Sequence, residues 1–251
     1  MDFAKEQQFE ALGFVNLGPI FKKEQLETIG KEYDRLVTPR AQMLGNKEEG
    51  EFPYRAMLNF RSAPLAAFIN HPAILEVAQR FLGDDIRFWW DQGINKTPGA
   101  QSPIDWHQDN GYTHGRTKAF LTFWLALDAS DTENGGLIVI PGSQHHGLLP
   151  HHYENVHAVV DESRFDVDRA VALDACAGDM LVFSSYLIHR TVGNHTTDRH
   201  RRAWVMQYCQ ADQRNEETGE IYDNRPWVMR GGEIVPEPTS ERPFRLHNER
   251  P

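Results

Sequence analysis

The chain has 251 residues, of which 40% are hydrophobic and 25% charged, within the range of ordinary globular proteins. Its 26 Lys and Arg against 36 Asp and Glu give a net charge of −10, which disfavours nucleic-acid binding through a broadly basic surface, and its two cysteines exclude a disulfide framework or a cysteine-based zinc site. No apolar run approaches the roughly 18 residues of a membrane span, and residues 1–14 lack the apolar core of a signal peptide, so we expect a cytoplasmic protein without a membrane partner.

The first third of the chain is predicted to be mainly helical. Residues 4–12 form one helical stretch that ends at Gly13, and residues 14–17 are predicted to form a short strand. In residues 22–36, apolar side chains recur three and four positions apart, which is typical of an amphipathic helix. Residues 72–83 begin with Pro72 and end with Gly83, the residue types favoured at the first turn and just past the end of a helix.

Short apolar and aromatic segments follow from residue 85 onward and are predicted to be strands. They comprise residues 85–90, 119–127, 137–140, 170–174, 179–184 and 202–208, separated by turn signals such as Asn134-Gly135-Gly136. Helices followed by many short strands indicate an α+β fold whose main body is a strand-rich sandwich or barrel. A parallel α/β fold is less favoured, because no helical segments alternate with these strands.

The chain is predicted to form a single domain over residues 1–251, since no Gly/Ser, Pro or single-charge run provides a linker. We expect a helical layer over about residues 4–83 and a strand-rich core over about 85–210. Residues 211–251 are polar and rich in Pro and Arg, so they are predicted to form a surface tail or a lid over the core.

Histidine followed two positions later by a carboxylate is a metal-ligand spacing, because residues i and i+2 of a strand point to the same face. Together with a distant histidine, the pair would form the facial triad of non-haem Fe(II) oxygenases. However, 12 histidines and 36 acidic residues in 251 positions give about 1.7 such pairs by chance, and three occur. The spacing alone therefore decides nothing. The three pairs are His107/Asp109, His152/Glu154 and His247/Glu249.

Context favours the first pair. His247 has no later histidine to complete a triad, and His152 lies in the polar residues 150–155, which are predicted to form a loop. His107 instead stands just before the strand-rich segment, and His189 follows the strand predicted at 179–184. Two adjacent arginines, Arg201 and Arg202, stand at the start of the strand predicted at 202–208. They point to opposite faces, so only one of them can clamp a buried carboxylate.

The order of these motifs resembles the phytanoyl-CoA dioxygenase family over roughly residues 8–210. The resemblance rests on the motifs Asn95-Lys96-Thr97-Pro98, Trp106-His107-Gln108-Asp109, Trp124, Glu133-Asn134-Gly135-Gly136-Leu137, Ile140-Pro141-Gly142-Ser143, His189-Arg190-Thr191 and Arg201. It implies an Fe(II)- and 2-oxoglutarate-dependent oxygenase on a double-stranded β-helix, or jelly-roll (cupin-like), core with N-terminal helices packed on one sheet. The reaction would hydroxylate, or otherwise oxidise, an unactivated C–H bond of a small-molecule metabolite with O₂, releasing succinate and CO₂.

The resemblance also implies roles for particular residues. The iron ligands, and hence the catalytic centre, would be His107, Asp109 and His189. The 2-oxoglutarate site would contain Arg201, Thr191, Gln108, Trp124 and Gln92. Relatives often continue Pro-Gly-Ser with His, where this chain has Gln144, a difference that leaves the ligand set intact.

Asp109 itself favours hydroxylation, because halogenating relatives carry a small residue at that position so that chloride can bind. Two alternatives remain open at this point: a binding or sensor protein that kept the fold without catalysis, and a cupin-like metalloenzyme that uses no 2-oxoglutarate.

Overall fold

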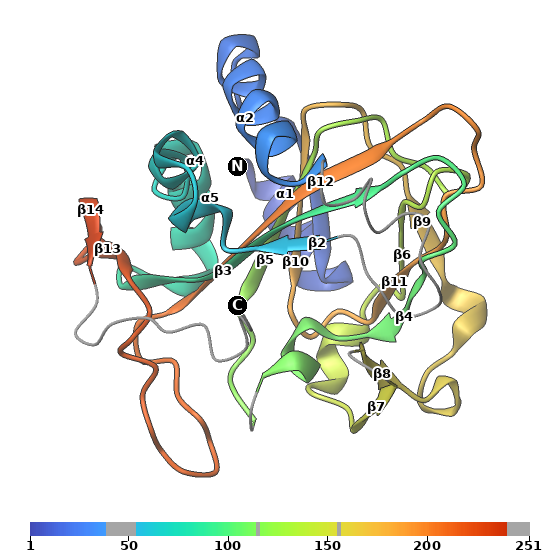
Figure 1. Cartoon of the computed structure of the whole chain (residues 1–251). Coiled ribbons are helices and arrows are strands. Elements are labelled where there is room, and N and C mark those ends of the chain that lie inside the picture. Colours follow the sequence, from blue (N-terminus) through green and yellow to red (C-terminus); the bar gives the residue numbers. More distant parts are fainter. Residues whose placement is uncertain (39–53, 114–115, 155–156, 240–251) are drawn as a thin grey trace.

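A computed structural model describes residues 1–38, 54–113, 116–154 and 157–239, in which antiparallel sheets dominate and helices are few (Figure 1). His247 and Glu249 lie outside these residues. The described α-helices are α1 (Phe3–Leu12), α2 (Lys23–Leu36), α4 (Ala63–Phe68) and α5 (Pro72–Leu82). Short 3₁₀ helices are η1 (Leu58–Phe60), η2 (Asp109–Tyr112), η3 (Ser143–His146), η4 (Glu162–Arg164) and η5 (Val167–Arg169). No helix in the described part is long and apolar enough to cross a membrane.

The three predicted helices are confirmed to within one residue at each end, and local signals account for the ends of α1 and α5. The Asp2 side chain accepts the backbone N–H of Lys5 at the start of α1, and Gly13 ends that helix with φ of 84°. Pro72 opens α5, and Gly83 follows it with φ of 83°. In α2, the buried side chains are Ile29, Tyr33 and Leu36 of the predicted apolar face.

The larger sheet has eight strands, all paired antiparallel. Its order is β1 (Phe14–Pro19), β10 (Asp179–Ser184), β5 (Leu121–Ala126), β12 (Arg201–Gln210), β3 (Ile86–Lys96), β13 (Trp227–Arg230) and β14 (Glu233–Thr239), and β2 (Tyr54–Ala56) also pairs with β3. The two longest strands, β3 and β12, lie side by side in its centre, with Lys96 opposite Arg201 and Gln92 opposite Val205. The strand predicted at 85–90 thus continues six residues further.

The smaller sheet has four strands and lies across from the larger one (Figure 1). Its order is β4 (Ile104–His107), β11 (His189–Thr191), β6 (Leu137–Val139) and β9 (Val171–Leu173). A separate hairpin consists of β7 (His151–Glu154) and β8 (His157–Val160), so the loop prediction for residues 150–155 is wrong. Four of these residues form a strand, because β7 pairs with β8, and the polar sequence of β7 gives no sign of this pairing.

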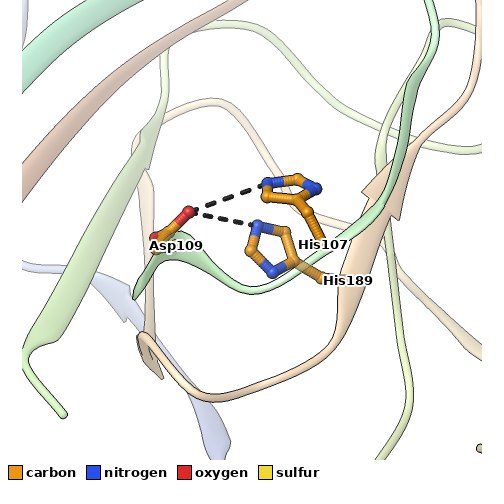
Figure 2. Close-up of side chains that lie close together, drawn as sticks. All are labelled: His107, Asp109 and His189. Atoms are coloured by element: carbon orange, nitrogen blue, oxygen red, sulfur yellow. Dashed lines mark ion pairs between the residues drawn. The ribbon is translucent and has the colours of Figure 1, made fainter. Parts of the chain in front are cut away.

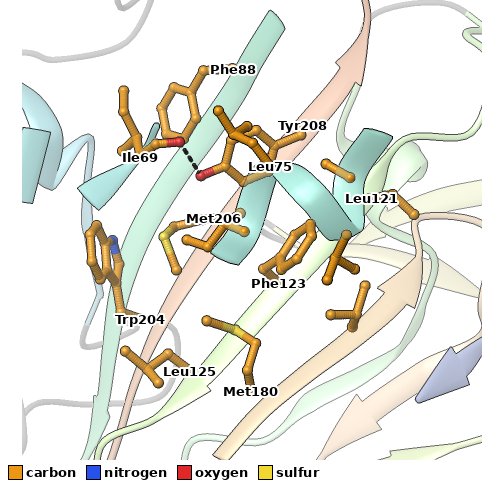
Figure 3. Packing of buried hydrophobic residues seen from close by; sticks show 14 of the residues in the cluster. Ile69, Leu75, Phe88, Leu121, Phe123, Leu125, Met180, Trp204, Met206 and Tyr208 are labelled. Atoms are coloured by element: carbon orange, nitrogen blue, oxygen red, sulfur yellow. Dashed lines mark hydrogen bonds between the residues drawn. The ribbon is translucent and has the colours of Figure 1, made fainter. Parts of the chain in front are cut away.

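The two faces of the larger sheet belong to different buried clusters. Residues of one face, including Phe88, Phe123 and Met206, cluster with buried side chains of the helices, such as Leu75 of α5 (Figure 3). The Tyr208 hydroxyl donates to the carbonyl of Ile69 at 2.7 Å within this cluster. The opposite face contributes to a second cluster that also contains residues of the smaller sheet, so the interior between the sheets is closed by apolar packing.

The segment after β12 extends the larger sheet instead of only lying on its surface. β13 pairs with the first residues of β3 and then turns back into β14. Arg87 of β3 secures the intervening chain, because its guanidinium donates to the carbonyls of Ala211 and Arg225 and stacks 4.1 Å from the Trp227 ring. Residues 240–251 of the predicted tail lie outside the described part.

Candidate metal and co-substrate site

Two histidines from distant parts of the chain are direct neighbours in the smaller sheet. His107 is the last residue of β4 and His189 the first of β11, and the two are opposite each other in the register of these strands. Their ring centroids are 4.1 Å apart, and only 4% of each residue is exposed (Figure 2). The pairing of β4 with β11 therefore brings together side chains that are 82 positions apart.

Backbone carbonyls determine which ring nitrogen of each histidine is available. Nδ1–H of His107 donates to the carbonyl of Asp105 at 2.7 Å, and Nδ1–H of His189 donates to that of Leu187 at 3.0 Å. In both rings Nε2 is then unprotonated and carries the lone pair that can bind a metal. Burial, together with the neighbouring His189, lowers the pKa of His107 well below its usual value, so its ring is neutral at neutral pH, as metal binding requires.

Asp109 completes the cluster from the first turn of η2. Its Oδ1 lies 3.7 Å from Nε2 of His107 and 3.6 Å from Nε2 of His189, so one carboxylate oxygen faces both free lone pairs (Figure 2). Ligand atoms of the three residues all lie within 4.8 Å of one another. Two imidazole nitrogens and one carboxylate oxygen on one side of a buried space are the donor set of a facial Fe(II) site.

Arg201 points into the interior between the sheets. The residue is fully buried, its Nε donates to the carbonyl of Gly135 at 2.9 Å, and its guanidinium carbon lies 5.7 Å from the centre of the Trp124 ring. Both terminal nitrogens of Arg201 lack a hydrogen-bond partner among the described residues. Burial lowers the pKa of Arg201 to about 10. A buried guanidinium with two unused donor nitrogens fits a bidentate carboxylate ligand.

Arg202 faces the other way. It makes a bidentate pair with Asp128, with an Nη2–Oδ1 distance of 2.6 Å, and a second ion pair with Asp34 of α2 at 2.8 Å. The charge of Arg202 is thus compensated by two carboxylates of the protein itself. The alternation of side chains along β12 thus separates a structural arginine from one whose donors are available.

Lys96 is a residue of this site that the sequence analysis did not assign. It lies opposite Arg201 in the register of β3 and β12, is fully buried, and its Nζ donates to Thr191 Oγ1 at 2.7 Å and to the carbonyl of Val192. Burial, and then the charge of Arg201, lowers the pKa of Lys96 well below its usual value. Its position in Asn95-Lys96 was the available signal, but the strand was predicted to end at residue 90.

Neither Lys96 nor Arg201 forms a salt bridge with any carboxylate in the described part of the chain. Buried basic groups without an acidic partner are costly, and a ligand with two negative charges would compensate both. 2-Oxoglutarate is such a dianion, so the residues present fit the co-substrate that the family resemblance implies.

The remaining predicted co-substrate residues are not equally placed. Trp124 and Gln92 lie on the interior face of the larger sheet, since both pair with Val205 of the second cluster. Thr191 is buried beside Lys96. Gln108 differs: its amide donates to the carbonyls of Gly147 and Tyr186 and accepts from the backbone N–H of Leu149, so its side-chain donors and acceptor are used in joining loops. It follows His107 directly, and neighbouring side chains of an extended segment point in opposite directions.

His151 of β7 contacts the turn that follows His107. Nε2 of His151 accepts the backbone N–H of Gln108 at 3.2 Å, and a Cβ atom added at Gly111 would lie 2.4 Å from the His151 ring. The hairpin of β7 and β8 therefore packs tightly against the turn that carries Asp109. Gln144, at the position where relatives often have His, donates to the carbonyl of Glu10 and ties η3 to α1.

Comparison with known proteins gives three consistent findings. A family model described as phytanoyl-CoA dioxygenase matches residues 9–203. A probable alpha-ketoglutarate-dependent hypophosphite dioxygenase of Stutzerimonas stutzeri is 26% identical over 82% of this chain and 79% of its own length. The human peroxisomal phytanoyl-CoA dioxygenase is 29% identical, but the match covers 59% of this chain and only 46% of the human protein.

Solved structures share the fold. The structure of EvdO2 from Micromonospora carbonacea var. aurantiaca complexed with 2-oxoglutarate superposes with a TM-score of 0.74, at 24% identity, over 86% of this chain and 93% of that one.

Proposed function

The chain belongs to the phytanoyl-CoA dioxygenase family and is an Fe(II)- and 2-oxoglutarate-dependent oxygenase, and from this premise we propose that it hydroxylates an unactivated C–H bond of a small-molecule metabolite. The family prediction, the enzyme class and the requirement for iron and 2-oxoglutarate are confirmed. The residue roles and the reaction outcome are proposed from the geometry of the site, and the substrate class from the relatives.

We assign the iron to His107, Asp109 and His189. Bound Fe(II), with 2-oxoglutarate and O₂, supplies the oxidising chemistry, in which one oxygen atom enters succinate and the other enters the substrate. Each of the three residues would contribute one ligand atom to the iron. The carbonyls of Asp105 and Leu187 keep both imidazoles in the tautomer whose Nε2 is a free lone pair.

We assign the 2-oxoglutarate site to Arg201 and Lys96, with Thr191, Trp124 and Gln92 around them. The observation that carries this assignment is the buried Arg201 guanidinium, whose two terminal nitrogens have no partner among the described residues. Buried apolar side chains such as Trp124 and Val205 line the space between the sheets, and in such surroundings a hydrogen bond from Arg201 to a carboxylate is stronger than in water.

Hydroxylation is the outcome that the donor set favours. Asp109 supplies a third protein ligand, so no position of the triad is left for a halide. We further propose that the two sheets correspond to the double-stranded β-helix of the family, in one domain whose helical layer covers the larger sheet and whose C-terminal segment extends that sheet through β13 and β14. Relatives named for hypophosphite and for 1-deoxypentalenic acid support a small-molecule substrate.

Succinate release tests this function directly. The purified chain would be incubated with Fe(II), ascorbate, 2-oxoglutarate and members of a metabolite panel, and succinate measured against the rate without added substrate. We expect one chemical class to raise succinate release and to gain one oxygen atom by mass spectrometry. A His189→Ala variant is the matched control, because it removes one of the two imidazole ligands, and it should show neither effect. Succinate release that persists in His189→Ala would contradict the assignment of the iron ligands.

A further inference from the structure

The second carboxylate oxygen of Asp109 is engaged by two side chains that no sequence motif identifies. Oδ2 accepts the hydroxyl of Thr122 at 2.5 Å and Nε2 of Gln207 at 3.0 Å. Gln207 also donates to Thr122 Oγ1 at 3.3 Å, so the three side chains form one closed network. Oδ1, in contrast, faces the two imidazoles. The two oxygens of this carboxylate therefore have separate roles.

These contacts join the two sheets at the metal site. Thr122 lies on β5 and Gln207 opposite it on β12, both in the larger sheet. The two histidines belong to the smaller sheet, and Asp109 begins η2, two residues after the end of β4. The carboxylate is thus oriented relative to the imidazoles by hydrogen bonds from the opposite sheet.

The network is buried, which makes it energetically important. Thr122 is fully buried, Gln207 is 8% exposed, and the Asp109 side chain is 13% exposed. In such surroundings a hydrogen bond to a charged group is stronger than in water, and its loss leaves an unsatisfied oxygen. Two donors on one oxygen also fix the rotation of the carboxylate about its last side-chain bond.

We propose that Thr122 and Gln207 are positioning residues that hold Asp109 as a one-oxygen ligand of the iron. This inference rests on the iron site assigned above. A carboxylate can bind a metal through one oxygen or both, and a facial triad leaves three positions open. With Oδ2 occupied by two donors, only Oδ1 is available. Without them, Oδ2 is free to turn toward the metal and to close one of the open positions.

Titration of the metal-free protein with Co(II) alone tests the proposal without turnover. Thr122→Val keeps the shape of the side chain and removes the hydroxyl, and Gln207→Leu removes the amide. We expect each to weaken Co(II) binding by about 10- to 100-fold, the range for residues that orient metal ligands. We also expect altered visible absorption of the bound Co(II), because that spectrum reports coordination number and geometry.

Two further variants separate positioning from folding. Thr122→Ser retains the hydroxyl and should restore wild-type Co(II) affinity and spectrum. Tyr208→Phe is the matched control: the hydroxyl of the fully buried Tyr208 donates to the carbonyl of Ile69 in the cluster on the opposite face of the larger sheet, so its loss should leave the bound spectrum unchanged. If Gln207→Leu fails to fold, the Val and Ser variants at position 122 still decide.

Wild-type affinity and spectrum in Thr122→Val would overturn the proposal. Thr122→Ser that behaves like Thr122→Val would also overturn it, because the hydroxyl would then be irrelevant. Failure of the wild-type chain to bind Co(II) is a different result: it would contradict the iron site itself, and with it the proposed function.

Discussion

Replacing Arg201 by Met should weaken 2-oxoglutarate binding and at the same time stabilise the ligand-free protein. Methionine has a similar length but neither charge nor donors, so it fills the buried space without addressing a carboxylate. The two effects have opposite signs because the same guanidinium that would bind the co-substrate is an uncompensated buried charge when the co-substrate is absent.

The magnitudes follow from the contacts of Arg201. Truncating one partner of a buried, hydrogen-bonded charge pair costs about 2 to 5 kcal/mol, and each 1.4 kcal/mol is tenfold, so the dissociation constant should rise from roughly 30-fold to a few thousand-fold. Burial lowers the pKa of Arg201 to about 10. At about 1.36 kcal/mol per pKa unit, burying the charge costs on the order of 3 kcal/mol at neutral pH, where the folded and unfolded states are both protonated. Losing the hydrogen bond to Gly135 offsets about 1 kcal/mol of this.

Calorimetric titration of 2-oxoglutarate into Mn(II)-loaded protein measures the first effect, and urea unfolding of the ligand-free protein measures the second. Arg202→Met is the matched control on the neighbouring residue. It breaks the pairs with Asp128 and Asp34, so it should lower the free energy of unfolding by about 1 to 2 kcal/mol and leave 2-oxoglutarate affinity unchanged. Unchanged 2-oxoglutarate affinity in Arg201→Met would refute the assignment of the co-substrate site.

Three further outcomes are expected from single substitutions. Lys96→Met should raise the 2-oxoglutarate dissociation constant by about tenfold in the same calorimetric titration, less than Arg201→Met, because Lys96 Nζ is already bonded to two protein oxygens. Burial raises the pKa of Asp91 to about 7, so the free energy of unfolding should fall as the pH rises from about 4 through 7 and the buried carboxyl loses its proton. Asp91→Asn should make the difference in free energy of unfolding between pH 5 and pH 8 smaller by a few kcal/mol, as measured by urea unfolding. An unchanged difference between the two pH values would contradict this prediction. Gly93→Ala should lower the free energy of unfolding by about 1 to 3 kcal/mol, because a Cβ there would lie 2.6 Å from Val37, whereas Gly30→Ala, which meets nothing within 4 Å, should be neutral or stabilising in the same assay.

The parts of the fold that the sequence predicts are those with local causes. Capping residues and apolar spacing place α1, α2 and α5 within a residue or two, because both act within a few positions along the chain. The end of β3 was missed for the converse reason. Residues 91–96 have weak strand propensity, and they are extended because β12 pairs with them along their whole length.

The site shows the same division. The sequence by itself determined the ligand types, the order of the motifs and the fact that Arg201 and Arg202 face opposite ways, since the alternation of a strand is a local property. Only the tertiary structure decided that His189 lies opposite His107, that Lys96 accompanies Arg201, and that Gln108 serves the loops. It also supplied Thr122 and Gln207, whose contacts with Asp109 have no signature in the sequence. These relations depend on which strands pair across long stretches of chain, and that pairing is set by the burial of both sheets together, which no local pattern encodes.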